Sequence, residues 1–126
     1  MNRNLAQGAL LAAAVLLLGG CAAGWDKSSF TLEEVFSNPD LTILQNPKED
    51  TERLCQGVDG CLEGWTTGDG EFLRFESNES AAAFAKQLGD EGHQSNRVVI
   101  DFERAEPSAQ RRELMIELIE GVHNSE

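Results

Sequence analysis

Two short strand-like runs flank the tripeptide Gly68-Asp69-Gly70, and they constrain the fold of this chain more than any other feature. The first run is Leu62 to Thr67 (LEGWTT), and the second is Glu71 to Glu76 (EFLRFE). Two β-prone runs that are joined by a short glycine-containing loop are typical of a β-hairpin. The sequence therefore predicts an antiparallel pair of strands within an α+β domain.

Capping signals and hydrophobic periodicity predict the elements around this hairpin. Thr31-Leu32-Glu33-Glu34 has the form of a capping box, and Ser77 precedes a helical pattern that Gly89 ends. In chain order, we expect a short helix over 31–37, a strand over 41–45, a helix over 47–57, the hairpin, a helix over 78–88, a strand over 97–102 and a helix that begins at Pro107.

This order of elements matches the ferredoxin-like arrangement β-α-β-β-α-β, followed by an extra C-terminal helix. In that arrangement a four-stranded antiparallel sheet carries two helices on one face. The strand over 41–45 has the weakest pattern. Without it, the same residues give a three-stranded α+β domain with an N-terminal helical arm. In both cases the length predicts a single domain, over residues 30–126.

The first 21 residues have the layout of an export signal. Arg3 provides a positive charge, and an apolar stretch follows from Leu5 to Leu18. This stretch is shorter than the roughly 20 apolar residues that a transmembrane helix needs. It ends in Leu18-Gly19-Gly20-Cys21, which resembles the lipobox of bacterial lipoproteins: a branched apolar residue, two small residues and a cysteine.

The resemblance implies that the Cys21 thiol receives a diacylglyceryl group and that residues 1–20 are removed as a signal peptide. Further acylation, with palmitate or a similar chain, would hold the protein on the extracytoplasmic side of a cell membrane. Residues 21–29 would then form the tether. The rest of the chain is similar to small bacterial lipoproteins without an assigned activity. Ordinary secretion, with cleavage after Ala22 or Ala23, is the alternative.

Both readings leave Cys55 and Cys61 as the only other cysteines. In an oxidising compartment, an even remainder predicts a disulfide, and this one would fix a turn. The alternatives are a redox pair, for which a Cys-x-x-Cys spacing is more usual, and half of a metal site, which would need further ligands at close spacing.

The chain is strongly acidic, with 22 Asp and Glu residues against 10 Lys and Arg residues and a formal net charge of −12. A field of this sign repels phosphate backbones. The composition therefore excludes nucleic acid as a partner.

Alternation along the strands predicts which side chains share a face of the sheet. We expect Leu73 and Phe75 to lie on one face with Val98, Ile100 and Phe102, and we expect the helices to cover that face. The other face would carry the candidate partner-binding residues Trp65, Phe72 and Val99, together with Leu62. It would be covered either by an element of the chain itself, the N-terminal arm or the C-terminal helix, or by a protein partner or a second copy.

Motifs for catalysis or cofactor binding are absent from the sequence: it has no P-loop, no G-x-S-x-G and no H-E-x-x-H. We therefore expect a lipid-anchored protein-binding or accessory module without a cofactor. One alternative is a metal or small-ligand sensor that uses Asp90, Glu91 and His93. Another is a hydrolase that uses dispersed carboxylates as acid and base, with the candidates Asp59, Asp69, Glu71, Asp90 and Asp101.

Overall fold

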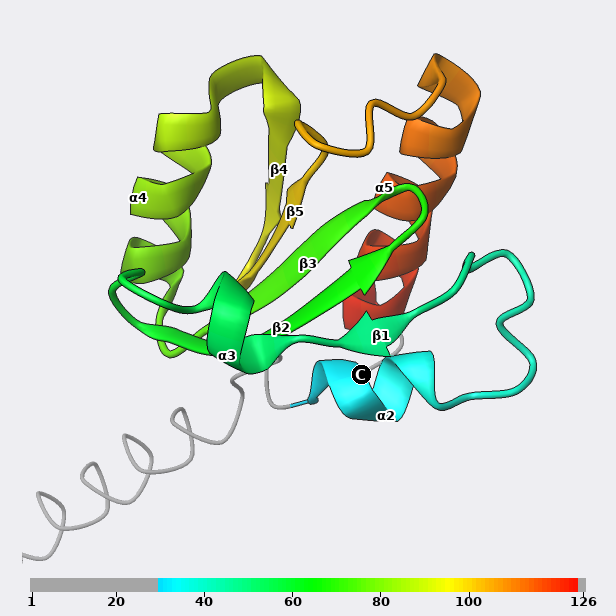
Figure 1. Ribbon diagram of the computed structural model, residues 1–126, viewed down its shortest axis with the longest axis horizontal. Coiled ribbons are helices and arrows are strands. Elements are labelled where there is room, and N and C mark those ends of the chain that lie inside the picture. The colour runs from blue at the N-terminus through cyan, green and yellow to red at the C-terminus, as the bar shows by residue number, and fades with distance from the viewer. Residues whose placement is uncertain (1–29, 125–126) are drawn as a thin grey trace, which may run out of the picture.

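The protein folds around one antiparallel sheet of five strands in the order β1-β2-β3-β5-β4, in a computed structural model that describes residues 30–124 (Figure 1). The strands are β1 (Lys48–Glu49), β2 (Cys61–Thr67), β3 (Gly70–Phe75), β4 (Gly92–Ser95) and β5 (Val98–Asp101). The helices are α2 (Leu32–Phe36), α3 (Thr51–Leu54), α4 (Asn78–Leu88), the 3₁₀ turn η1 (Gly89–Glu91) and α5 (Ala109–Asn124). The predicted α+β class and the C-terminal helix are confirmed.

The helices α2 and α4 begin at the caps that the sequence predicts. The Thr31 hydroxyl accepts from Glu34 N at 3.2 Å, and the Glu34 carboxylate accepts from Thr31 N at 3.1 Å, which completes a capping box. The Ser77 hydroxyl accepts from Ser80 N at 3.1 Å. These bonds satisfy backbone donors that have no partner inside the helix.

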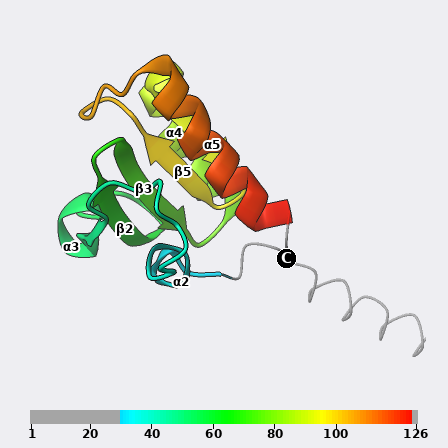
Figure 2. The same cartoon turned by 90° about the vertical axis from the view of Figure 1, so that its right-hand side faces the viewer.

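Each face of the sheet carries its own hydrophobic core. One core joins Phe72 and Ile100 to α2 and α5, through residues such as Phe36 and Met115. The other core joins Leu73 and Val99 to α3 and α4. Helices therefore cover both faces, and the two views place α4 and α5 on opposite sides of β5 (Figures 1 and 2).

The predicted grouping of side chains across strands is wrong. In the β3–β5 register, Phe72 lies opposite Ile100 and Leu73 lies opposite Val99. Directly opposed residues of antiparallel strands point to the same face. Phe72 and Val99 therefore face opposite cores. Of the two alternatives for the cover of Phe72, the structure shows the chain's own elements, since Phe72 lies in one core with residues of α2 and of α5.

Three segments differ from their predicted structure. Residues 41–45 form no strand, and Leu41, Ile43 and Leu44 instead pack their side chains against the core of α2 and α5. The helix predicted over 47–57 is divided between β1, which pairs with β2, and the single turn of α3. The segment 89–94, which lies between the predicted helix over 78–88 and the predicted strand over 97–102, contains η1 and most of β4.

The ferredoxin-like topology is not confirmed, because these differences change both the strand count and the layers. That topology needs a strand over 41–45, which precedes the hairpin, and it needs both helices on one face of the sheet. Here β4 pairs with β5 at one edge, and α4 and α5 cover different faces.

The predicted signal peptide, Cys21 and the tether over 21–29 lie outside the described residues. Within residues 30–124, none of the helices has both the length and the apolar character that a membrane crossing requires.

Candidate functional site

The disulfide loop over 55–61 forms one wall of the candidate site. Cys55 and Cys61 are joined, as the sequence predicts. Within the loop, Val58 N donates to Cys55 O at 3.0 Å and Cys61 N donates to Val58 O at 3.3 Å. Gly60 O accepts from Glu76 N at 2.8 Å, which fastens the loop to the end of β3. The loop is therefore held in place by covalent and backbone bonds.

The helix α4 forms the opposite wall. Gly60 has a φ of +77°, and a Cβ atom at this position would collide with the side chain of Ser80 in the first turn of α4. The loop and the helix can pack this closely only because the residue at 60 is a glycine. Farther along α4, Phe84 packs against Phe75 of the sheet, with 5.5 Å between the ring centroids.

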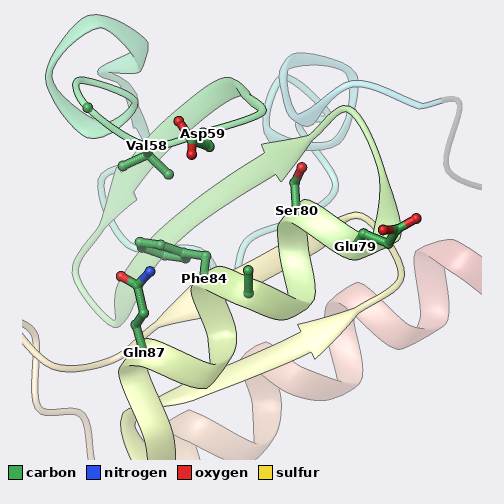
Figure 3. Close-up of a pocket in the computed structure, with 8 residues that line it drawn as sticks. Val58, Asp59, Glu79, Ser80, Phe84 and Gln87 are labelled. Carbon is green, nitrogen blue, oxygen red and sulfur yellow. The ribbon is translucent and has the colours of Figure 1, made fainter.

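A pocket of about 350 Å³ lies between the two walls (Figure 3). This volume is near the lower end of the roughly 300–1,000 Å³ range of ligand pockets. Val58 from the loop and Phe84 from the helix provide its apolar lining, and both pack against the core of α3 and α4. The remaining lining residues are Gly57, Asp59, Glu79, Ser80, Ala83 and Gln87. We call this hollow the loop–helix pocket.

The charged groups of the loop–helix pocket are all acidic. Asp59 and Glu79 are both exposed, and the described part of the chain places no lysine or arginine in the lining of the hollow. Within residues 30–124, neither carboxylate takes part in an ion pair or a side-chain hydrogen bond. Both carboxylates are therefore available to an external partner.

The predicted partner-binding residues lie elsewhere. Phe72 and Val99 are fully buried in the two cores and have no surface to offer a partner. Trp65 is half-buried, and its indole N–H donates to Glu63 at 3.0 Å. Among residues 30–124, Leu62 is the exposed large hydrophobic residue, at 47%. It lines a second hollow together with Trp65.

The predicted metal-binding residues contact α5 instead. Asp90 O accepts a hydrogen bond from Arg112, and Glu91 pairs with the same guanidinium at 3.6 Å. His93 Nε2 lies 3.0 Å from the Glu120 carboxylate. Within the described part of the chain, no group of three or more His, Cys, Asp or Glu side chains has an arrangement that would hold a metal ion.

The structure brings only one pair of the dispersed carboxylates together. Glu71 and Asp101 lie directly opposite each other in the β3–β5 register. Glu71 is also 3.4 Å from Arg53 and 3.9 Å from Arg104. Asp69 is buried against Arg111, Asp59 lies in the loop–helix pocket, and Asp90 lies in η1. These five carboxylates therefore do not form one acid–base site.

Sequence reasoning missed a buried polar cluster between β4 and α5. Ser95 Oγ lies 2.7 Å from His123 Nδ1, and the two residues are 5% and 3% exposed. Glu120 lies beside this pair with its side chain 45% exposed. Its hydrogen bond with His93 lowers the pKa of the carboxyl group, burial opposes this effect, and Ser95 adds a smaller lowering contribution. A serine beside a histidine is a pattern of nucleophilic catalysis. At this degree of burial, however, the pair contacts no substrate and instead links the strand to the helix.

Sequence reasoning also missed Glu63, which organises the start of α2. Its carboxylate accepts from Leu32 N at 2.8 Å, Glu33 N at 2.9 Å and Arg74 Nε at 3.0 Å. Burial raises the pKa of Glu63, but the bonds from Leu32 N, Arg74, Trp65 and Glu33 N outweigh this effect and lower it overall. No local signal indicates such a role, because the two backbone donors of α2, Leu32 N and Glu33 N, lie 31 and 30 residues away in the sequence.

We also compared the chain with other proteins. Comparison with protein-family models, with curated protein sequences and with solved structures found no match.

Proposed function

We propose that this protein is a lipoprotein, anchored through Cys21 on the extracytoplasmic side of a cell membrane, whose α+β domain binds a protein partner. The lipobox-like segment Leu18-Gly19-Gly20-Cys21 supports the anchor and the location. The disulfide between Cys55 and Cys61 fits an oxidising compartment. A tether of nine residues, 21–29, would restrict the domain to partners within about 30 Å of the same membrane surface.

The loop–helix pocket is the observation that carries the binding role. Apolar side chains that line a concave surface, beside polar groups without internal partners, are typical of a binding site. Val58 and Phe84 provide the apolar part, and Asp59 and Glu79 provide the polar part. Both walls are held rigidly, by the disulfide and by the sheet, so little conformational entropy is lost when a partner binds.

Lipid labelling tests the anchor. Cells that express the full chain and cells that express the Cys21→Ser variant are grown with an alkyne fatty acid and fractionated. We expect label and membrane association in the wild type and loss of both in the variant. Equal labelling of the two proteins would contradict the proposal.

Site-specific crosslinking tests the binding role in intact cells. A photoreactive amino acid replaces Ala83, which is exposed and lines the pocket, or Gln110, which is exposed on α5 as a control. We expect a protein adduct of one defined mass from position 83 and none from position 110. An adduct pattern that is the same at both positions would contradict a role for the pocket.

A further inference from the structure

We propose that the loop–helix pocket receives a basic side chain, arginine above all, from an extended segment of the protein partner. This inference rests on the proposed function and specifies the chemistry of the partner at the same site.

The charge of the pocket selects a cation. Asp59 comes from the loop and Glu79 from the first turn of α4. In Figure 3 the Glu79 side chain extends away from the loop, so a group that enters between the walls meets the carboxylate of Asp59 and has Glu79 farther out on the rim. The formal net charge of −12 adds a long-range field of the same sign. Such a field raises the local concentration of cationic groups and speeds their association.

The apolar lining selects a cation with a long hydrocarbon stem. Val58 and Phe84 can cover the methylene groups of a lysine or arginine side chain while the charged end stays near the rim. Phe84 also offers an aromatic ring, which attracts a guanidinium group by about 0.5–2 kcal/mol. A cation–π contact of this kind occurs elsewhere in the protein, where the guanidinium carbon of Arg112 lies 4.5 Å from the centroid of the Phe102 ring.

Arginine can make more contacts with the lining residues than lysine can. Its planar guanidinium stacks on aromatic rings and presents five donors. The hollow provides acceptors for them, in the carboxylate of Asp59 and in the side-chain carbonyl of Gln87, whose end lies beside the Phe84 ring in Figure 3.

Other occupants fit less well. A second copy of this chain carries the same net charge of −12, so repulsion opposes self-association at an acidic rim. An anionic ligand would meet two carboxylates and no basic residue in the lining. A metal ion would find only two carboxylates there, which is fewer than the oxygen ligands that calcium takes.

Peptide binding to the full-length protein in non-ionic detergent tests this inference. The first probe is a capped Gly/Ser nonapeptide with one central arginine. The second probe is the same peptide with citrulline, which has the same shape but no charge. Binding is followed by the backbone NMR shifts of the ¹⁵N-labelled protein. We expect saturable shifts over 57–59 and 79–87 with the arginine peptide, and about tenfold weaker binding with citrulline.

Two pairs of substitutions distinguish the effect of the pocket carboxylates on binding from the effect of the net charge of the protein. Asp59→Asn with Glu79→Gln neutralises the rim. Glu113→Gln with Glu117→Gln makes the same change in net charge on exposed residues of α5. We expect about tenfold weaker arginine binding in the first double variant and unchanged binding in the second. Phe84→Leu, with its fold checked by circular dichroism, should weaken binding severalfold because it removes the aromatic ring.

Three outcomes would overturn the inference. They are equal binding of the two peptides, equal weakening by the two double variants, and shifts that lie outside the pocket. A crosslinked partner at position 83 together with any of these outcomes would reject the basic side chain and leave the proposed binding role intact.

Discussion

The guanidinium of Arg111 lies against the carboxylate of Asp69, with 2.5 Å between Nη2 and Oδ2 and 3.1 Å between Nε and the same oxygen. Asp69 is in the β2–β3 turn and is 5% exposed, whereas Arg111 is in the first turn of α5. The same guanidinium donates to Ile43 O at 2.6 Å. One side chain therefore joins the hairpin turn, the 41–45 segment and the C-terminal helix.

Arg111→Ala should lower the free energy of unfolding clearly, because it leaves the buried Asp69 carboxylate without its charge partner. Arg104→Ala is the matched control, since Arg104 is 73% exposed and lies 3.9 Å from Glu71. An exposed ion pair contributes little. Urea unfolding of both variants gives the comparison, and equal midpoints would contradict the role of Arg111.

Phe72→Ala should destabilise the fold by about 3–5 kcal/mol, because it leaves a large cavity in the core. The Phe72 ring is fully buried and contacts Phe36, with 5.0 Å between the ring centroids. Urea unfolding measures the change. A variant with wild-type stability would contradict the role of Phe72 in the core.

The parts of the fold that depend on local signals could be predicted from the sequence. Ser77 and Gly89 bound α4, and Gly68 and Asp69 connect β2 to β3, because caps and turns depend on nearby residues. The strand β4, with the sequence GHQS, carries no such signal. It pairs with β5 across the two-residue turn Asn96-Arg97, where Asn96 has a φ of +53°, so the pairing with β5, and not the β-propensity of its own residues, makes it a strand.

The loop–helix pocket depends on tertiary contacts to a greater degree than these helices and strands do. Asp59 and Phe84 are 25 positions apart in the sequence, and each has an ordinary local explanation, a disulfide turn for one and the apolar stripe of a helix for the other. Only the contact of the loop with α4 makes them neighbours. The disulfide itself was predictable, since it follows from the number of cysteines and the expected compartment.

Replacing both Cys55 and Cys61 with serine should lower the free energy of unfolding by about 2 kcal/mol, as the chain-entropy model gives for so short a loop. The same double variant should lose binding at the loop–helix pocket, because the loop is one of its walls. Urea unfolding and the arginine-peptide titration measure the two effects. Unchanged binding in a folded double variant would show that the wall does not need the disulfide.

Gly60→Ala should destabilise the protein more than Gly57→Ala. Both glycines have a positive φ, +77° and +72°, so each alanine brings a backbone strain of about 1 kcal/mol. At Gly57 the space for a Cβ atom is open, whereas at Gly60 it is occupied by the Ser80 side chain. Thermal unfolding of the two variants separates the steric contribution from the strain, and equal losses would contradict the close contact of loop and helix.

Acid should weaken the fold through Glu63. Because hydrogen bonds lower the pKa of this carboxyl below its ordinary value of 4.5, its ionised form stabilises the folded state above that pH. The contribution is lost as the pH falls below about 4.5 and the carboxylate in the folded protein takes up a proton. Urea midpoints at a series of pH values from 7 to 3 should therefore fall less steeply in Glu63→Gln than in the wild type. Glu113→Gln is the control, since this exposed residue has no such bonds in the described chain and should leave the slope unchanged. Parallel curves for the wild type and Glu63→Gln would mean that the four donors around Glu63 do not hold its carboxylate ionised.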